Sequence, residues 1–168
     1  NLGPYVNKDV TALLRTQLSH LPTNDHAIIT LSKKGLYYLS GTVVAKCNVT
    51  LSGCGSKSKF ILCNGSDNKD FKAFTDDTFL EFIGTKNHPI SVDIQNLSID
   101  LQEHTGFWWL NSPNGKRNAK FAVKIYHAHR VNVNKVNSTL KNALCTTFDL
   151  RVCTNISFSN CRLTNFNN

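Results

Sequence analysis

The last third of the chain repeats itself, and this repeat limits the possible folds more than any other feature of the sequence. Phe121–Ile125 is followed by a turn and by Val131–Val136, and Thr147–Leu150 is followed by a similar turn and by Ile156–Cys161. Apolar residues of the two copies pair at a constant separation of 25 positions: Val123 with Phe148, Ile125 with Leu150, Val131 with Ile156, Val133 with Phe158, Val136 with Cys161. A fixed period of roughly 20–50 residues is typical of stacked repeats.

Earlier segments fit the same pattern. Val92–Leu97 and Val49–Cys54 match the second half of the repeat, and Leu80–Phe82 matches Val123–Ile125. Alternating apolar residues predict a strand with one buried face, and the doubled spacer within the pattern predicts a bend between two short strands. The sequence therefore predicts an all-β parallel β-helix, a solenoid in which each turn contacts only its neighbours.

A helix is expected before the first strand. From Asp9 onward, apolar residues follow the spacing of an amphipathic helix, and Pro22 ends the pattern. We expect this helix to cap the first turn of the solenoid. The predicted organisation is an N-terminal segment with a short capping α-helix over residues 1–26 and β-helix coils over residues 27–168. We expect the coils to be incomplete at the C-terminal end, because no cap follows the last repeat.

The opening turns carry a resemblance to a known family. After the helix at Asp9–Leu13, the sequence continues with Gly35–Val43 and then Asn48–Gly55. This order resembles the start of a pectin-lyase-like right-handed β-helix, and it is most similar to those of phage tailspikes and tail appendages and of secreted polysaccharide-degrading enzymes. The resemblance covers nearly the whole chain. The calcium-binding Asp clusters and paired Asp motif of the pectin-degrading members do not occur here, which argues against pectin chemistry.

The resemblance also implies a function, a location and partners. It implies a module of a phage tail appendage or tailspike that recognises a bacterial surface polysaccharide, with depolymerase activity left open. The expected setting is extracellular, on a virion tail or secreted, in a homotrimer or a larger virion assembly. The alternative is the catalytic domain of a secreted polysaccharide hydrolase or lyase.

The chain has a formal charge of +8, from 19 Lys and Arg against 11 Asp and Glu. Such an excess favours acidic partners, but the basic residues are scattered along the sequence, so we interpret the charge as a general solubility feature. We therefore expect no nucleic acid partner. No run of eighteen apolar residues occurs, and we expect no insertion into a membrane.

Six cysteines occur, and two of them, Cys54 and Cys161, fall on the last inward position of the repeat. They are expected to be small apolar core residues. A disulfide between Cys47 and Cys54, or between Cys145 and Cys153, is the alternative. None of the six forms a C-x-x-C pair, and no metal or other cofactor is expected.

Five N-x-Ser/Thr sequons occur, at Asn48, Asn64, Asn96, Asn137 and Asn155. Asn48, Asn96 and Asn155 lie within the repeat, next to its inward positions or at its corners. Asn tolerates a left-handed backbone and can bond to adjacent turns, so a structural role is expected. Glycosylation of a secreted protein is the alternative.

The first candidate site is a column of charged residues. Glu81, Lys124 and Asp149 each lie between two inward residues and should point outward from three successive turns. One interpretation is a salt-bridged ladder. The other is a sugar-cleaving site with Glu81 and Asp149 as the two carboxylates that glycosidases use, and with Lys124 in contact with the glycan.

The second candidate site is an aromatic loop. The interval from Val92 to Val131 is 39 residues, against 25 in the next turn, so an excursion must leave the solenoid between residues 100 and 120. One interpretation of this excursion is a glycan-binding loop, because loops on a rigid scaffold tend to carry function. Its candidate residues are Phe107, Trp108, Trp109, Glu103 and Arg117. The other interpretation is that its aromatic residues pack back onto the coil and cover its apolar side. A two-His metal site at His127 and His129 is a further alternative to a solvated corner at that point.

Overall fold

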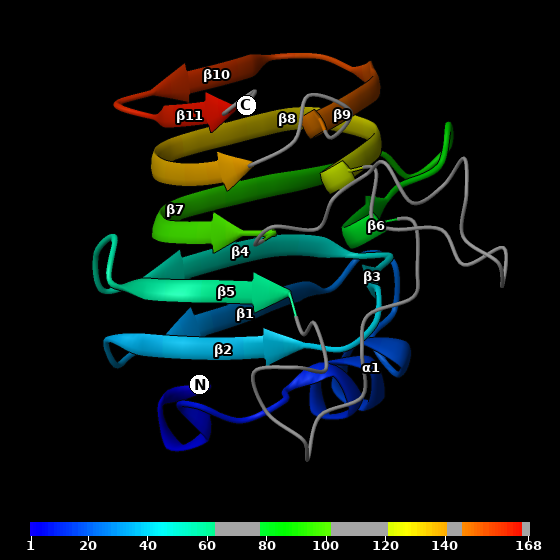
Figure 1. Cartoon of the computed structure of the whole chain (residues 1–168). Helices are drawn as coiled ribbons and strands as arrows, with labels where there is room; N and C mark the ends of the chain where they lie inside the picture. Colours follow the sequence, from blue (N-terminus) through cyan, green and yellow to red (C-terminus); the bar gives the residue numbers. More distant parts are fainter. Residues whose placement is uncertain (63–77, 102–120, 141–145, 166–168) are drawn as a thin grey trace, which may run out of the picture.

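The protein is built around one curled sheet of eleven strands, and a computed structural model describes residues 1–62, 78–101, 121–140 and 146–165 (Figure 1). All of its strand pairs are parallel in this part of the chain. The strands are β1 (His26–Leu31), β2 (Gly35–Leu39), β3 (Val43–Ala45), β4 (Asn48–Gly53), β5 (Ser58–Leu62), β6 (Thr78–Ile83), β7 (Ile90–Asp100), β8 (Phe121–Leu140), β9 (Thr146–Cys153), β10 (Ile156–Ser159) and β11 (Arg162–Asn165). The predicted all-β class is confirmed.

The strands stack in three rows. The first row contains β3, β6, the start of β8 and β9. The second row contains β1, β4, the first half of β7, the middle of β8 and β10. The third row contains β2, β5, the second half of β7, the end of β8 and β11. One passage of the chain through the second, third and first rows is a layer, and the layers follow one another up the molecule (Figure 1).

The register between layers is the one that the sequence repeat predicts. Val131 pairs with Ile156 in the second row, and Val123 pairs with Phe148 in the first row. The weaker match in the earlier repeats also holds, because Leu80 pairs with Val123. Equivalent residues therefore lie over one another although their separation in the sequence varies from layer to layer.

Asparagines hold two of the corners, as expected. Asn96 and Asn155 both adopt a positive φ, of 59° and 49°. The side-chain amide of Asn96 donates to the carbonyl of Gly53 at 3.1 Å, and that of Asn155 donates to the carbonyl of His129 at 3.0 Å. Each of these bonds joins one layer to the layer before it, which confirms the predicted structural role. Asn48 also bonds across layers, since its Oδ1 accepts from the backbone N–H of Ser91 at 2.8 Å.

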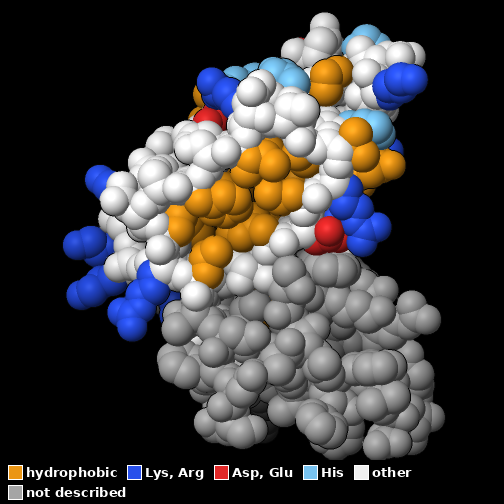
Figure 2. Space-filling view, turned by 90° about the horizontal axis from the view of Figure 1, so that it is seen from above, with side chains coloured by type: hydrophobic (Ala, Val, Ile, Leu, Met, Phe, Trp, Pro, Cys, Tyr) orange, Lys and Arg blue, Asp and Glu red, His pale blue; other side chains and the backbone are white. Residues whose placement is uncertain are grey.

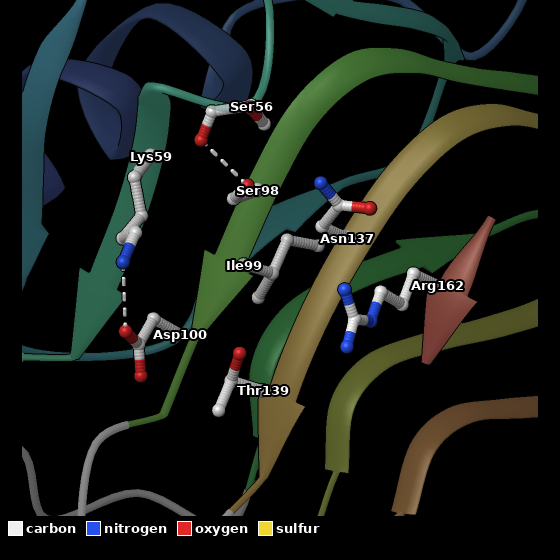
Figure 3. Close-up of a pocket in the computed structure, with 8 residues that line it drawn as sticks. All are labelled: Ser56, Lys59, Ser98, Ile99, Asp100, Asn137, Thr139 and Arg162. Carbon is white, nitrogen blue, oxygen red and sulfur yellow. Dashed lines mark hydrogen bonds and ion pairs between the residues drawn. The ribbon is translucent and has the colours of Figure 1, made fainter. Parts of the chain in front are cut away.

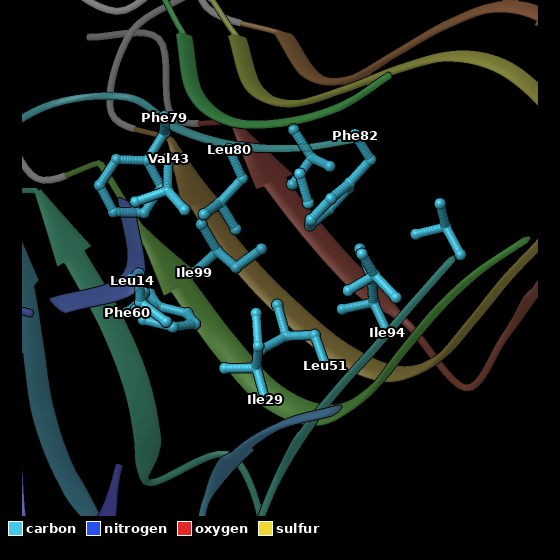
Figure 4. Packing of buried hydrophobic residues seen from close by; sticks show 14 of the residues in the cluster. Leu14, Ile29, Val43, Leu51, Phe60, Phe79, Leu80, Phe82, Ile94 and Ile99 are labelled. Atoms are coloured by element: carbon cyan, nitrogen blue, oxygen red, sulfur yellow. The ribbon is translucent and has the colours of Figure 1, made fainter. Parts of the chain in front are cut away.

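The inward side chains of the three rows meet in a single core (Figure 4). Leu51 and Ile94 lie in register in the second row and are buried, as are Phe60 of the third row and Phe82 of the first. Burial of each such side chain contributes about 1.5–3 kcal/mol. The core thus runs along the stack and fixes the outward positions of every layer.

The N-terminal segment covers the first layer. The short 3-10 helix Gly3–Tyr5 is followed by α1 (Thr11–Ser19), which buries Leu14 and Leu18. The backbone N–H groups of Leu2 and Val10 donate to carbonyls of β1 and β2, at 2.8 and 2.9 Å. These bonds satisfy groups that an edge strand would otherwise leave open. The predicted helix is therefore present, and among the described residues no helix is long and apolar enough to cross a membrane.

The last layer presents an apolar surface. Ile156, Phe158 and Leu163 occupy inward positions, yet they are 46%, 42% and 46% exposed. Figure 2 looks down on this layer and shows a continuous apolar patch over it. The equivalent Val131 and Val133 in the layer below are fully buried, because the last layer covers them.

The prediction for Cys54 is wrong. It was expected inside, yet it is exposed, and its backbone N–H donates to the hydroxyl of Ser58 at 3.1 Å. The turn between β4 and β5 is longer than the equivalent corner of β7, and it carries Cys54 outward. Cys161 is partly buried against the core, as expected. Cys47 is free and buried, so no Cys47–Cys54 bridge forms, while Cys145 lies outside the described residues.

Candidate functional site

A polar groove of about 280 Å³ crosses the third row of strands (Figure 3). It is lined by Ser56, Lys59, Ser98, Ile99, Asp100, Asn137, Thr139 and Arg162. These residues come from β5, β7, β8 and β11 and the turn before β5. Four successive layers therefore contribute to one continuous polar surface.

Strand alternation places the polar strand residues of this set outward in two columns. Lys59 pairs in register with Ser98, Ser98 with Asn137, and Asn137 with Arg162. Two positions further along the strands, Asp100 pairs with Thr139 in the second column. Successive side chains point to opposite faces of a strand, so the residues between the columns point into the core. The same pattern that builds the core thus builds the groove.

Two interactions hold the floor of the groove in place. The ammonium of Lys59 lies 3.0 Å from Oδ2 of Asp100, and the hydroxyl of Ser98 donates to the carbonyl of Ser56 at 2.7 Å. Partly exposed ion pairs of this kind contribute about 0–1 kcal/mol, so the pair matters more for orientation than for stability. The guanidinium of Arg162 has no ion-pair partner in the described part of the chain.

The groove borders the corner between the third and first rows of strands. Between the third and first rows the connections run over residues 40–42, 63–77, 101–120 and 141–145 in successive layers. Only this corner varies so widely in length, and per-layer insertions on one side of a stack often form its binding face. Asp100 and Thr139 lie at or near the ends of their strands, beside this corner.

The predicted aromatic loop belongs to the connection between β7 and β8. Phe107, Trp108, Trp109, Glu103 and Arg117 all lie outside the described residues. β7 ends at Asp100 and β8 begins at Phe121, so the connection between them is the segment in which the sequence spacing predicts an excursion. The glycan-binding role of these residues stays a prediction.

The predicted charged column is present on the first row, away from the groove. Glu81 pairs in register with Lys124, and Lys124 with Asp149. The ammonium of Lys124 lies 3.9 Å from Oε1 of Glu81. Nε of Arg151 donates to both oxygens of Asp149, at 3.1 and 3.0 Å, and this bond raises the pKa of the Arg151 guanidinium.

The column has the geometry of an ion-pair ladder. Both carboxylates already have a cationic partner, and Arg151 occupies the two oxygens of Asp149 that a substrate would need. A catalytic role for Glu81 and Asp149 stays a prediction. Their layers are two steps apart, or roughly 9–10 Å at the usual spacing between strands.

The two histidines considered for a metal have other contacts. The ring of His129 bonds to the hydroxyl of Ser91 at 2.9 Å and to the carbonyl of Pro89 at 3.0 Å, and His127 contacts the ring of Tyr126. Within the described ranges, no three His, Cys, Asp or Glu side chains gather closely enough to hold a metal ion.

Sequence reasoning missed most of the groove. The sequence indicates Asn137 only as a sequon, and none of the other groove residues is a predicted site residue. The signal was nevertheless available, because Asn137 and Arg162 are separated by the repeat period of 25 residues and flank inward positions. Extending the repeat past Val136 would have placed both in one outward column.

The chain was also compared with known proteins. No family model, no curated protein and no solved structure matches it.

Proposed function

We propose that this chain is the β-helix module of a phage tail appendage or tailspike and that it recognises a bacterial surface glycan. The observation that carries the proposal is the polar groove that spans four layers beside the corner with the variable connections. In this proposal the protein acts outside the cell, on a virion tail, and assembles as a homotrimer or as part of a larger virion assembly. Light scattering of the purified chain measures the assembly state, and a monomer at all concentrations contradicts the trimer.

The proposal includes a right-handed parallel β-helix. It is supported by exclusively parallel pairing in the described part of the chain, by three rows that keep their register apart from one shift between Ile90 and Ser91, and by short connections at two of the corners. Crossover connections between parallel strands are right-handed in about 98% of cases, which supports the hand. A rigid stack of this kind gives a linear ligand a linear series of equivalent contacts.

The groove offers the contacts that a sugar chain needs. Asn137 and Thr139 supply an amide and a hydroxyl from the same strand, and the Lys59–Asp100 pair supplies a cation and an acceptor at fixed positions. A few oriented polar groups of this kind give a binding site its specificity. The proposal also assigns Trp108 and Trp109 to glycan binding, by stacking on the apolar faces of sugar rings.

The test uses a panel of bacterial surface polysaccharides and titration calorimetry. Asn137→Ala removes a groove contact, and Asn132→Ala is the matched control on the same strand, in the second row. Each lost hydrogen bond weakens binding by about 0.5–1.5 kcal/mol, so we expect up to a tenfold loss for Asn137→Ala and none for Asn132→Ala. Equal affinities for the two variants contradict the proposal that the groove binds the glycan. Unchanged affinity after Trp108→Ala and Trp109→Ala contradicts the glycan-binding role of these two residues.

Polysaccharide cleavage, by a hydrolase or lyase, is the second candidate. It is favoured by one observation, the register that stacks Glu81 and Asp149 two layers apart on one face. Their separation is near the upper limit for an inverting glycosidase, roughly 6.5–9.5 Å. The assay measures new reducing ends or unsaturated uronates. Loss of cleavage in Glu81→Gln or Asp149→Asn supports this function, and absence of cleavage by the unaltered protein rules it out for the glycans tested.

A further inference from the structure

Stacking brings together basic residues that are far apart in the sequence. The corner between the second and third rows contains Lys33 and Lys34 in the turn before β2, Lys57 in the turn before β5, and Lys135 at the bend of β8. Arg162 lies at the start of β11, two positions past the same corner. We call these five residues the basic ridge. In Figure 2, Lys and Arg side chains project from this corner at the left of the view, and the acidic side chains that are visible lie elsewhere.

The ridge is a line of unpaired charge. Its residues come from the first, second, fourth and fifth layers, so it extends about 19 Å along the stack at roughly 4.8 Å per layer. All five side chains belong to exposed residues, and none has an ion-pair partner among the described residues. The carboxylates of Asp100 and Asp93 are already paired, with Lys59 and Arg130 respectively. The sequence-based interpretation of scattered basic residues is therefore incomplete.

Charge of one sign in a line suits a linear polyanion, and the neighbouring side chains narrow its chemistry. No aromatic residue occurs in the turns of this corner, although proteins that bind single-stranded nucleic acids use aromatic rings to stack on bases. Amides of Asn96, Asn134 and Asn160 lie between the cations instead. Amides are suited to the hydroxyls of a sugar chain. Among the described residues, none of the exposed large apolar side chains belongs to the turns of this corner, so the turns lack anchors for a lipid surface.

We infer that the basic ridge binds a linear acidic polysaccharide, whose carboxylates or sulfates lie along the stack. This inference rests on the proposed function and names the chemical class of its glycan. Arg162 belongs to both the ridge and the groove, so one polymer can contact both surfaces.

The strength of binding should depend steeply on salt, because each neutralised charge releases a counterion. With the coefficient for single strands, five contacts weaken the affinity about 100-fold when salt rises fourfold, and three contacts weaken it about 20-fold. The ridge variant is Lys34→Gln with Lys57→Gln. The control is Lys46→Gln with Lys86→Gln, which removes the same charge from two exposed lysines off the ridge.

The experiment measures binding of the full chain to immobilised heparin, with neutral dextran and a DNA duplex as further probes, at two salt concentrations. We expect heparin binding with about a 100-fold salt effect in the unaltered protein and the control, and weaker binding with about a 20-fold effect in the ridge variant. Equal losses in the ridge variant and the control overturn the inference, because the attraction is then diffuse. Tighter binding of DNA than of heparin, with the same dependence on the ridge, also overturns it.

A groove variant separates this inference from the proposed function. If Asn137→Ala weakens heparin binding and the ridge variant does not, the proposed function stands and the ridge inference fails. If only the ridge variant weakens binding, the ridge inference stands and the groove is the wrong site. If neither heparin nor any glycan of the polysaccharide panel binds, both are wrong.

Discussion

Replacing Ser138 with alanine should stabilise the protein. Ser138 occupies an inward position of the third row, in register with Ile99 below and Leu163 above. It is 1% exposed, and in the described part of the chain its hydroxyl has no hydrogen-bond partner. A buried polar group without a partner costs about 1–3 kcal/mol. Ser138→Ala removes that cost and almost no volume, so we expect a gain of about 1 kcal/mol, or roughly 2–4 °C in Tm.

Ser98 provides the matched control. It is also buried, at 7% exposure, but its hydroxyl donates to the carbonyl of Ser56 at 2.7 Å. Ser98→Ala should therefore destabilise the protein by about 1 kcal/mol. Urea unfolding followed by circular dichroism measures both changes, with unchanged m-values as the check that each variant unfolds in the same way. If Ser138→Ala loses as much stability as Ser98→Ala, the Ser138 hydroxyl is satisfied and the reasoning is wrong.

Three further predictions follow from single residues. Val152 has a φ of +54°, which is strained for a β-branched side chain. Val152→Asn should therefore raise the free energy of unfolding by about 1 kcal/mol. A lower free energy of unfolding in urea contradicts this expectation. Burial raises the pKa of the Cys47 thiol, so iodoacetamide should modify the exposed Cys54 before Cys47. Mass spectrometry measures the order, and earlier modification of Cys47 refutes the expectation. Burial also raises the pKa of Tyr37, so its contribution to stability is complete below about pH 10 and is lost as pH rises through the folded-state pKa. The Tyr37→Phe variant should therefore lose less free energy of unfolding above that pH than the unaltered protein does. If the two proteins show parallel pH profiles of stability, Tyr37 does not cause the alkaline loss.

The strand register could be predicted from the sequence because two independent periods agree. Alternation within a strand fixes which residues point inward, and the 25-residue spacing fixes which of them stack, as with Val131 and Ile156. The failure at Cys54 shows the limit of this reasoning. Six residues separate Ser52 from Lys59, but only two separate their partners Gln95 and Ser98. The extra residues turn outward, with Gly55 at a φ of +114°, so the repeat no longer applies to Cys54.

The groove and the basic ridge were harder to predict because they depend on the lengths of the connections. Lys59 and Asp100 are 41 residues apart, and they form an ion pair because β5 and β7 stack in register. Nothing in the local sequence around either residue indicates the other. The same dependence places Lys57 and Lys135 at one corner, although no basic cluster occurs in the sequence.

In this arrangement the stacked strands provide the stability, and the connections between the third and first rows can vary in length. Each doubling of a loop costs only about 0.6 kcal/mol in closure entropy, whereas the buried residues of one layer contribute several times that amount. Connections such as 63–77 and 101–120 can therefore differ in length without shifting the register of β5, β7 and β8. If the groove binds a glycan, replacing residues 103–118 with a short Gly-Ser linker should change which glycans bind and leave the free energy of unfolding within about 1 kcal/mol of the original. A large loss of stability would show that this connection is part of the core, and the division between scaffold and binding loop would then be wrong.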